Sequence, residues 1–286
     1  MRRSPRFPGH VQLPTDRTLI MGILNVTPDS FSDGGRFLRV EDAVRHADKL
    51  VEQGADIVDV GGESTRPGSR RLSSQEELER IEPVVAALVA GGHVVSVDTV
   101  HAHTARVVCD LGAVMINDVS GAQADPLMAA AMAQSSAVVV IQHWRGFPGS
   151  DNERLLDDEA VPTVIADLHR QIEVVRNAGV ADERIAIDPG LGFAKTVDAS
   201  WDTLAALPTL MEQLPYPVVV GASRKRFVNA IVATPEAVES ATAAISALSA
   251  FHGAWAVRVH APQGNAAAIA AARQWVRGTM RLNNGQ

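Results

Sequence analysis

The chain has 286 residues, of which 46% are apolar, and this is enough to bury one large hydrophobic core. Its net charge of −7 argues against nucleic acid or an anionic membrane as a partner, because both attract basic surfaces. No apolar run approaches the ~20 residues that cross a bilayer, and the single cysteine, Cys109, excludes an internal disulfide framework and indicates a reducing, cytoplasmic location.

The chain begins with an arm and continues as a regular alternation of strands and helices. Residues 1–18 are rich in Arg and Pro and have no apolar core, so we expect a flexible N-terminal arm. Short β-branched runs then predict eight strands, at Leu19–Leu24, Ile57–Val60, Val94–Val97, Val114–Ile116, Val138–Ile141, Ile185–Ile187, Val218–Val220 and Val257–Val259. Amphipathic segments predict helices between them, among others at Glu41–Gln53, Ser74–Ala90, His103–Leu111, Val161–Ala178 and Ala237–Phe251.

This alternation predicts an α/β fold. Eight strands, each followed by a helical stretch, close most simply into a (β/α)8 TIM barrel. No linker divides the chain, so we expect a single domain at residues 19–278 and a C-terminal tail at 279–286. A doubly wound open sheet is the alternative, but it usually has fewer strands, and no GxGxxG motif follows the first strand. Ser74 with Glu77 resembles a capping box at the start of one helix.

The first strand leads into a polar loop that is long for a strand-to-helix connection. Such connections usually take about 2–6 residues, whereas polar residues, Pro and Gly here continue to Gly35. Extra loop at the carboxyl end of a parallel strand is where α/β folds carry their chemistry. We therefore favour a functional site here over an ordinary surface loop.

A barrel brings the ends of its strands to one mouth, and polar residues follow every predicted strand. Asp98, Asn117 and Asp188 follow the third, fourth and sixth strands, so their side chains can converge. Two carboxylates and a carboxamide with a lysine nearby suit a flat heterocycle that carries N–H donors, each charge-assisted bond being worth roughly 1.5–3 kcal/mol. Helix-capping Asp residues and a glycosidase-like carboxylate pair are the alternatives, and the aromatic content of 4% argues against a sugar cleft.

A second set of strand-end residues suits an anion. Its members are Arg66, Arg224, Arg258 and His260. Barrels often bind phosphate beside the loops after strands seven and eight, and Arg presents a rigid fork to phosphate oxygens. Asn25 can offer a neutral oxygen to Mg²⁺. Scattered solvated charge, and a turn or cap role for Asn25, are the alternatives.

Six motifs in this order resemble those of the dihydropteroate synthase family. They are Gly22–Gly35, Gly61–Gly68, Ser96–Thr99, Ile116–Gly121, Asp188–Phe193 and Ser223–Phe227. The resemblance runs from about Leu19 to about Trp275. It implies a pterin-binding TIM barrel that condenses two small molecules, 6-hydroxymethyl-7,8-dihydropterin diphosphate and 4-aminobenzoate, into 7,8-dihydropteroate and diphosphate in folate synthesis.

The resemblance also implies a role for each matching residue. The pterin would be held by Asp98, Asn117, Asp188 and Lys225. The diphosphate would meet Asn25, Thr65, Arg66, Arg258 and His260, with Asn25 as the ligand of a magnesium cofactor. The aminobenzoate pocket would be shaped by Thr65, Pro67, Phe193, Ser223 and Lys225. The catalytic set would be Asp33, Lys225, Arg258 and His260.

The reaction implied is an S_N1-like departure of diphosphate, because an aromatic amine is a weak nucleophile. Asp29 and Asp33 would help to stabilise the cationic methylene, and the loops after the first two strands, including residues 27–35, would close as a lid. The resemblance implies a homodimer through helices near the C-terminus.

The chain departs from the family pattern at two places. The family commonly reads Arg-x-His-Asp at the eighth strand, whereas Ala261 follows His260 here. Gln142 stands where Met is frequent, and the neighbouring His143 either serves the site or packs beneath it. Two other functions stay open: a pterin-binding paralogue without turnover, and a methyltransferase barrel that binds methyltetrahydrofolate.

Overall fold

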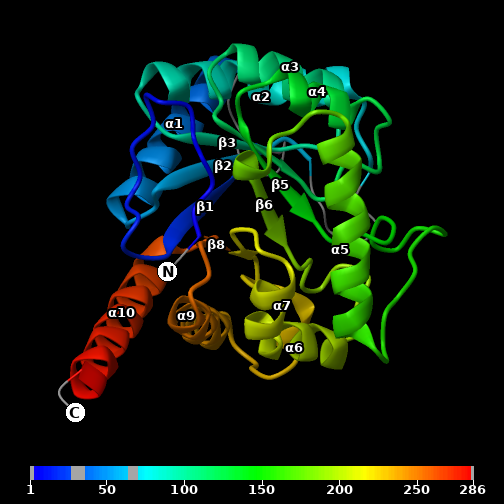
Figure 1. Cartoon of the computed structure of the whole chain (residues 1–286). Coiled ribbons are helices and arrows are strands. Elements are labelled where there is room, and N and C mark those ends of the chain that lie inside the picture. The colour runs from blue at the N-terminus through cyan, green and yellow to red at the C-terminus, as the bar shows by residue number, and fades with distance from the viewer. Residues whose placement is uncertain (1–2, 27–35, 64–69, 285–286) are drawn as a thin grey trace.

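Eight parallel strands form one sheet that curls into a barrel in the computed structural model, which describes residues 3–26, 36–63 and 70–284 (Figure 1). The strands are β1 (Leu19–Asn25), β2 (Ile57–Gly61), β3 (Val95–Asp98), β4 (Met115–Asp118), β5 (Val138–Gln142), β6 (Ile185–Asp188), β7 (Val219–Val220) and β8 (Ala256–Val259). Their order is β6-β5-β4-β3-β2-β1-β8-β7, and the parallel bridge Ile187–Val218 joins the two ends. The predicted (β/α)8 barrel is confirmed.

Helices follow the strands and cover the outside of the barrel (Figure 1). They are α1 (Arg36–Glu52), α2 (Ser74–Ala90), α3 (Ala102–Asp110), α4 (Met128–Gln134), α5 (Ala160–Asn177), α6 (Val197–Ala205), α7 (Leu207–Gln213), α8 (Arg226–Asn229), α9 (Pro235–His252) and α10 (Pro262–Asn284), with a 3₁₀ turn at Asp182–Arg184. Helix α10 continues to Asn284, past residue 278, where we expected a tail to begin. Among the described residues, no helix is long and apolar enough to cross a membrane.

The capping box of α2 lies one residue earlier than predicted. Ser73, not Ser74, is the N-cap: its side chain accepts from the backbone N–H of Glu76, and the Glu76 carboxylate accepts from the N–H of Ser73 at 3.0 Å. Glu77 instead is buried and accepts from the hydroxyl of Thr99 at 2.6 Å. The sequence contains two overlapping Ser-x-x-Glu patterns, and the face of α2 that packs on the barrel selects between them.

Alternate side chains along each strand belong to two separate hydrophobic cores. One set of side chains, such as Ile20 and Val58, faces the helices. The other set, such as Met21, Ile57 and Met115, fills the inside of the barrel. Because side chains alternate with a period of two, the inward face of each strand continues from this apolar floor to the mouth. The inward positions nearest the mouth carry the polar groups.

The N-terminal segment, expected to be a flexible arm, lies against the barrel over its described part, residues 3–18. Phe7 and Leu13 pack on the inner core, and the Phe7 ring lies 6.1 Å from that of Trp255. Arg17 forms an ion pair with Asp56 at 2.5 Å, and Asp56 also accepts from the N–H of Ile20. The arm is held because the floor of the barrel exposes apolar surface that this segment covers.

Candidate active site

Strand register aligns the predicted polar residues around the mouth of the barrel. Asn25 lies opposite Gly61, Gly61 opposite Asp98, and Asp98 opposite Asn117. Gly61 leaves a gap between two of them, because a Cβ there would lie 3.7 Å from both Asn25 Oδ1 and Asp98 Cβ. The convergence predicted from strand ends is therefore present on this side of the mouth.

The partly buried guanidinium of Arg258 joins β8 to β2 and β3 beneath this rim, and Asp59 extends the network to β4. Arg258 on β8 donates from Nε to Asp59 Oδ2 at 2.5 Å and from Nη2 to Asp98 Oδ2 at 2.6 Å. Asp59 also accepts from Asn117 Nδ2 at 3.1 Å and from Ser96 Oγ at 2.5 Å. We expected Arg258 on the diphosphate, and that role stays a prediction; in the structure its Nε and Nη2 bind two carboxylates. Its direct effect is to hold Asp98 in place.

Sequence reasoning did not single out Asp59 or Ser96 as parts of this site. A signal was present, since Asp59 is a charged residue in the middle of an otherwise apolar strand. A fully buried carboxylate requires a partner, and its position two residues before Gly61 puts it on the inward face. What the sequence did not indicate was that the partner comes from β8.

Burial shifts the ionisation of the groups that line the mouth. It raises the pKa of Asp98 to about 7, against the opposing charge of Arg258. It also raises the pKa of Asp188, with Lys225 opposing. For Lys225 burial lowers the pKa to about 8, with the Asp188 carboxylate opposing. Asp98 and Lys225 therefore change charge near neutral pH, which is typical of functional sites.

The other half of the mouth is built by β6, β7 and the loops that follow them. A Cβ at Gly221 would lie 3.4 Å from Asp188 Oδ2 and 3.6 Å from Lys225 Nζ, so the missing side chain leaves space between the two charges. Lys225 Nζ lies 4.6 Å from the centroid of the Phe193 ring. The structure thus brings together Asp188, Lys225 and Phe193 as predicted.

Ser223 and His260 meet at the edge of this half. Ser223 Oγ lies 2.9 Å from His260 Nδ1, and the backbone N–H of His260 donates to the same oxygen at 3.2 Å. These contacts connect the ends of β7 and β8 and fix both side chains relative to Lys225. The two residues were predicted in different subsites, and in the structure their side chains are in contact.

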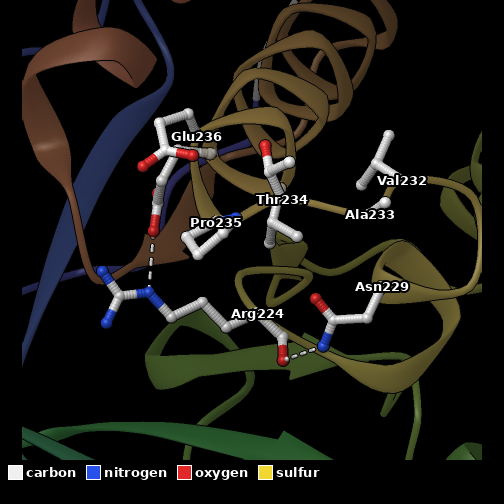
Figure 2. Close-up of a pocket in the computed structure, with 9 residues that line it drawn as sticks. Arg224, Asn229, Val232, Ala233, Thr234, Pro235 and Glu236 are labelled. Atoms are coloured by element: carbon white, nitrogen blue, oxygen red, sulfur yellow. Dashed lines mark hydrogen bonds and ion pairs between the residues drawn. The ribbon is translucent and has the colours of Figure 1, made fainter.

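Arg224 lies outside the mouth, in contrast to the anion role suggested by its place after a strand. Its backbone is left-handed, with φ of 57°. This turn directs its side chain outward, where Nε donates to Glu239 of α9 at 2.7 Å beside a cavity of about 570 Å³ (Figure 2). A left-handed backbone is strained for a residue with a Cβ. Arg224 stands between Ser223 and Lys225, whose side chains line the mouth.

Several predicted residues lie outside the described part of the chain. They are Asp29, Asp33, Thr65, Arg66 and Pro67, together with the lid proposed at residues 27–35. Their roles stay predictions.

Asp118, the last residue of β4, faces away from the mouth. Its carboxylate accepts from the N–H groups of Ser120 and Ala122, so it caps the loop that follows the strand. This is the capping role that was the alternative for an Asp at a strand end.

Comparison with known proteins decides the family. A family model described as pterin binding enzyme matches residues 21–260, from β1 to the end of β8. The chain belongs to the pterin-binding enzyme family.

Within this family the chain groups with the dihydropteroate synthases. It is 45% identical to the dihydropteroate synthase of Mycobacterium leprae over 269 residues, which cover 90% of this chain and 93% of that protein. A solved dihydropteroate synthase from Clostridium difficile, obtained in the presence of pteroic acid, is 38% identical with a TM-score of 0.85 and coverage of 91% and 97%. The Xanthomonas albilineans dihydropteroate synthase with 4-aminobenzoic acid is 40% identical with a TM-score of 0.82 and coverage of 90% and 92%.

Removing the buried carboxylate of Asp59 is expected to destabilise this pterin-binding fold. Asp59→Asn leaves Arg258 with one charged partner, and a broken buried pair costs about 3 kcal/mol. The measurement is the free energy of unfolding in urea. Arg176→Ala, which removes ion pairs at the surface, is the control and should change it little. Equal effects of the two substitutions would show that the pair does not hold the mouth together.

Proposed function

We propose that this chain condenses 6-hydroxymethyl-7,8-dihydropterin diphosphate with 4-aminobenzoate to give 7,8-dihydropteroate and diphosphate. The observation that carries the proposal is the convergence of Asp98, Asn117 and Asp188 in a barrel mouth whose other edge holds Lys225 and Phe193. Its relatives support both halves of the reaction, because one was solved with pteroic acid and another with 4-aminobenzoic acid.

The acceptors in the mouth suit the hydrogen-bonding edge of a pterin. Asp188 Oδ1 accepts from the N–H of Gly190 at 2.7 Å, while Oδ2 faces the space beside Gly221. Asn117 donates its amide N–H to Asp59, which turns its carbonyl oxygen away from that carboxylate. Each residue thus has one polar atom fixed by the protein and another for a ligand with N–H donors.

Electrostatics favour departure of the diphosphate over direct attack by the amine. A positive charge that develops on the pterin methylene would be stabilised by the carboxylates of Asp98 and Asp188 in their ionised form. The negative charge on the leaving group is met by the ammonium of Lys225, which burial alone does not discharge at neutral pH. Ser223 and His260 lie beside Lys225 and complete the polar edge for the aminobenzoate and the leaving group.

Magnesium would bind this site together with the diphosphate of the substrate. The described residues contain no cluster of three or more His, Cys, Asp or Glu that could hold a metal by themselves. Asn25 offers one exposed neutral oxygen at the mouth, and Mg²⁺ typically takes few protein ligands and completes its shell with phosphates and water. When bound, the ion would neutralise charge on the departing diphosphate.

The direct test is product formation. Purified chain with Mg²⁺, the pterin diphosphate and 4-aminobenzoate should yield dihydropteroate, and a chelator should lower the rate. Asn25→Ala should raise the Mg²⁺ concentration needed for half-maximal rate, whereas Asn177→Ala, at the exposed C-terminal end of α5, should not. Binding of the pterin diphosphate without any product would instead indicate the silent paralogue.

The pKa shifts predict a bell-shaped pH profile of kcat/KM. Asp98 is neutral below about pH 7 and ionises above it, so the rate should rise through that value. Lys225 loses its charge above about pH 8, so the rate should fall there. Lys225→Arg should retain the rising limb and lose the falling one, because Arg stays charged. A wild-type profile that is level across both values would contradict these assignments.

We also propose a homodimer formed through α9 and α10. The two helices lie side by side (Figure 1). They expose large apolar side chains, with Leu248 of α9 61% exposed and Trp275 of α10 71% exposed. Apolar side chains gathered on one part of a surface are typical of protein interfaces.

Light scattering tests this assembly. The wild-type chain should show twice the mass of one 30.4 kDa subunit, and Trp275→Glu or Leu248→Glu should shift the mass toward one subunit. Leu127→Glu is the matched control, because Leu127 is 56% exposed at the N-cap of α4, away from both helices. A wild-type mass of one subunit would overturn the proposal.

A further inference from the structure

A buried lysine supports the connection between β6 and α6. Lys195 is only 3% exposed. Its ammonium donates to the carbonyl oxygens of Gly190 at 2.9 Å and Phe193 at 3.3 Å, and it lies 2.8 Å from His143 Nδ1. Burial lowers the pKa of Lys195 to about 7, and the three acceptors match the three N–H bonds of its protonated form.

The proton arrangement of His143 follows from that contact. When Lys195 is protonated it has no lone pair, so Nδ1 accepts and the ring proton sits on Nε2, which faces Asp167 Oδ2 at 3.2 Å. Burial and the charge of Lys195 lower the pKa of His143 to about 4, which keeps the ring neutral. Arg145 and Arg170 also form ion pairs with Asp167, which belongs to α5. The Lys195–His143–Asp167 series is therefore anchored on that helix.

The loop that Lys195 supports carries groups for both substrates. It begins at Asp188, whose carboxylate faces the mouth, and includes Phe193, whose ring contacts Lys225. Three of its residues have left-handed backbones, namely Gly190, Gly192 and Ala194 with φ of 66°, 72° and 45°. Such a path forms no regular ladder, so its shape depends on contacts such as the two carbonyl bonds from Lys195.

We propose that Lys195, held by His143 and Asp167, is a positioning residue that sets Phe193 at the correct distance from Asp188 for the aminobenzoate. It touches neither substrate and acts through the Gly190 and Phe193 carbonyls. The inference rests on the proposed function, since it assigns the Phe193 side of the mouth to aminobenzoate.

The proposal predicts a selective kinetic defect. Lys195→Met keeps the length of the side chain but removes all donors, and losing hydrogen bonds of this strength corresponds to about a tenfold rise in KM for 4-aminobenzoate. The dissociation constant for the pterin diphosphate, measured by calorimetry, should change less than about twofold. Lys49→Met, which alters an exposed lysine of α1, is the control and should change neither constant.

A second variant keeps the test decisive if Lys195→Met does not fold. Asp167→Ala removes the partner of His143 at the α5 end and should raise the same KM by a smaller factor, about threefold. Equal losses for both ligands, or a lower melting temperature with unchanged constants, would overturn the inference. If the wild-type chain forms no product, the proposed function fails, and the two dissociation constants still make the same comparison.

Discussion

The ion pairs between Arg258 and the carboxylates of Asp59 and Asp98 are the constraint on which the site depends. They connect β8 to β2 and β3 inside the barrel, across the point where β1 separates them in the sheet. Charges this deep are tolerated only with good partners, and here Ser96 binds Oδ1 of Asp59 while Asn117 shares Oδ2 with Arg258. The same contacts orient Asp98 and Asn117, which we assign to the pterin.

The site holds ionisable groups of both signs in a buried region, where burial disfavours their charged forms. Burial shifts the pKa of Asp98, Asp188 and Lys225 toward the neutral form, and each shift is opposed by a neighbour of the other sign. Such fixed charges stabilise both the cation that forms on a substrate and the anion that leaves it, without the reorganisation that water would need. The apolar floor beneath, closed by Phe7 and Trp255, helps to keep this region dry.

Two layers of side chains therefore support the groups assigned to the substrates. Beneath the pterin residues lies the Arg258 cluster, which fixes side chains directly. Beneath the aminobenzoate residues lies the Lys195–His143–Asp167 series, which fixes backbone carbonyls. The difference has a local cause: Asp98 and Asn117 stand on strands whose ladders already hold the backbone, whereas Phe193 stands on a loop with left-handed turns.

The sequence by itself determined the fold class, the eight strands and most of the mouth. Short runs of β-branched apolar residues mark buried strands, and closing eight of them brings Asp98, Asn117 and Asp188 together without further information. Tertiary structure decided what strand ends alone cannot indicate. It selected Ser73 over Ser74, held the N-terminal arm, turned Arg224 outward, and brought Asp59 to Arg258, residues 199 positions apart. Local patterns report which face a residue occupies, but its partner across the barrel depends on how the whole sheet closes.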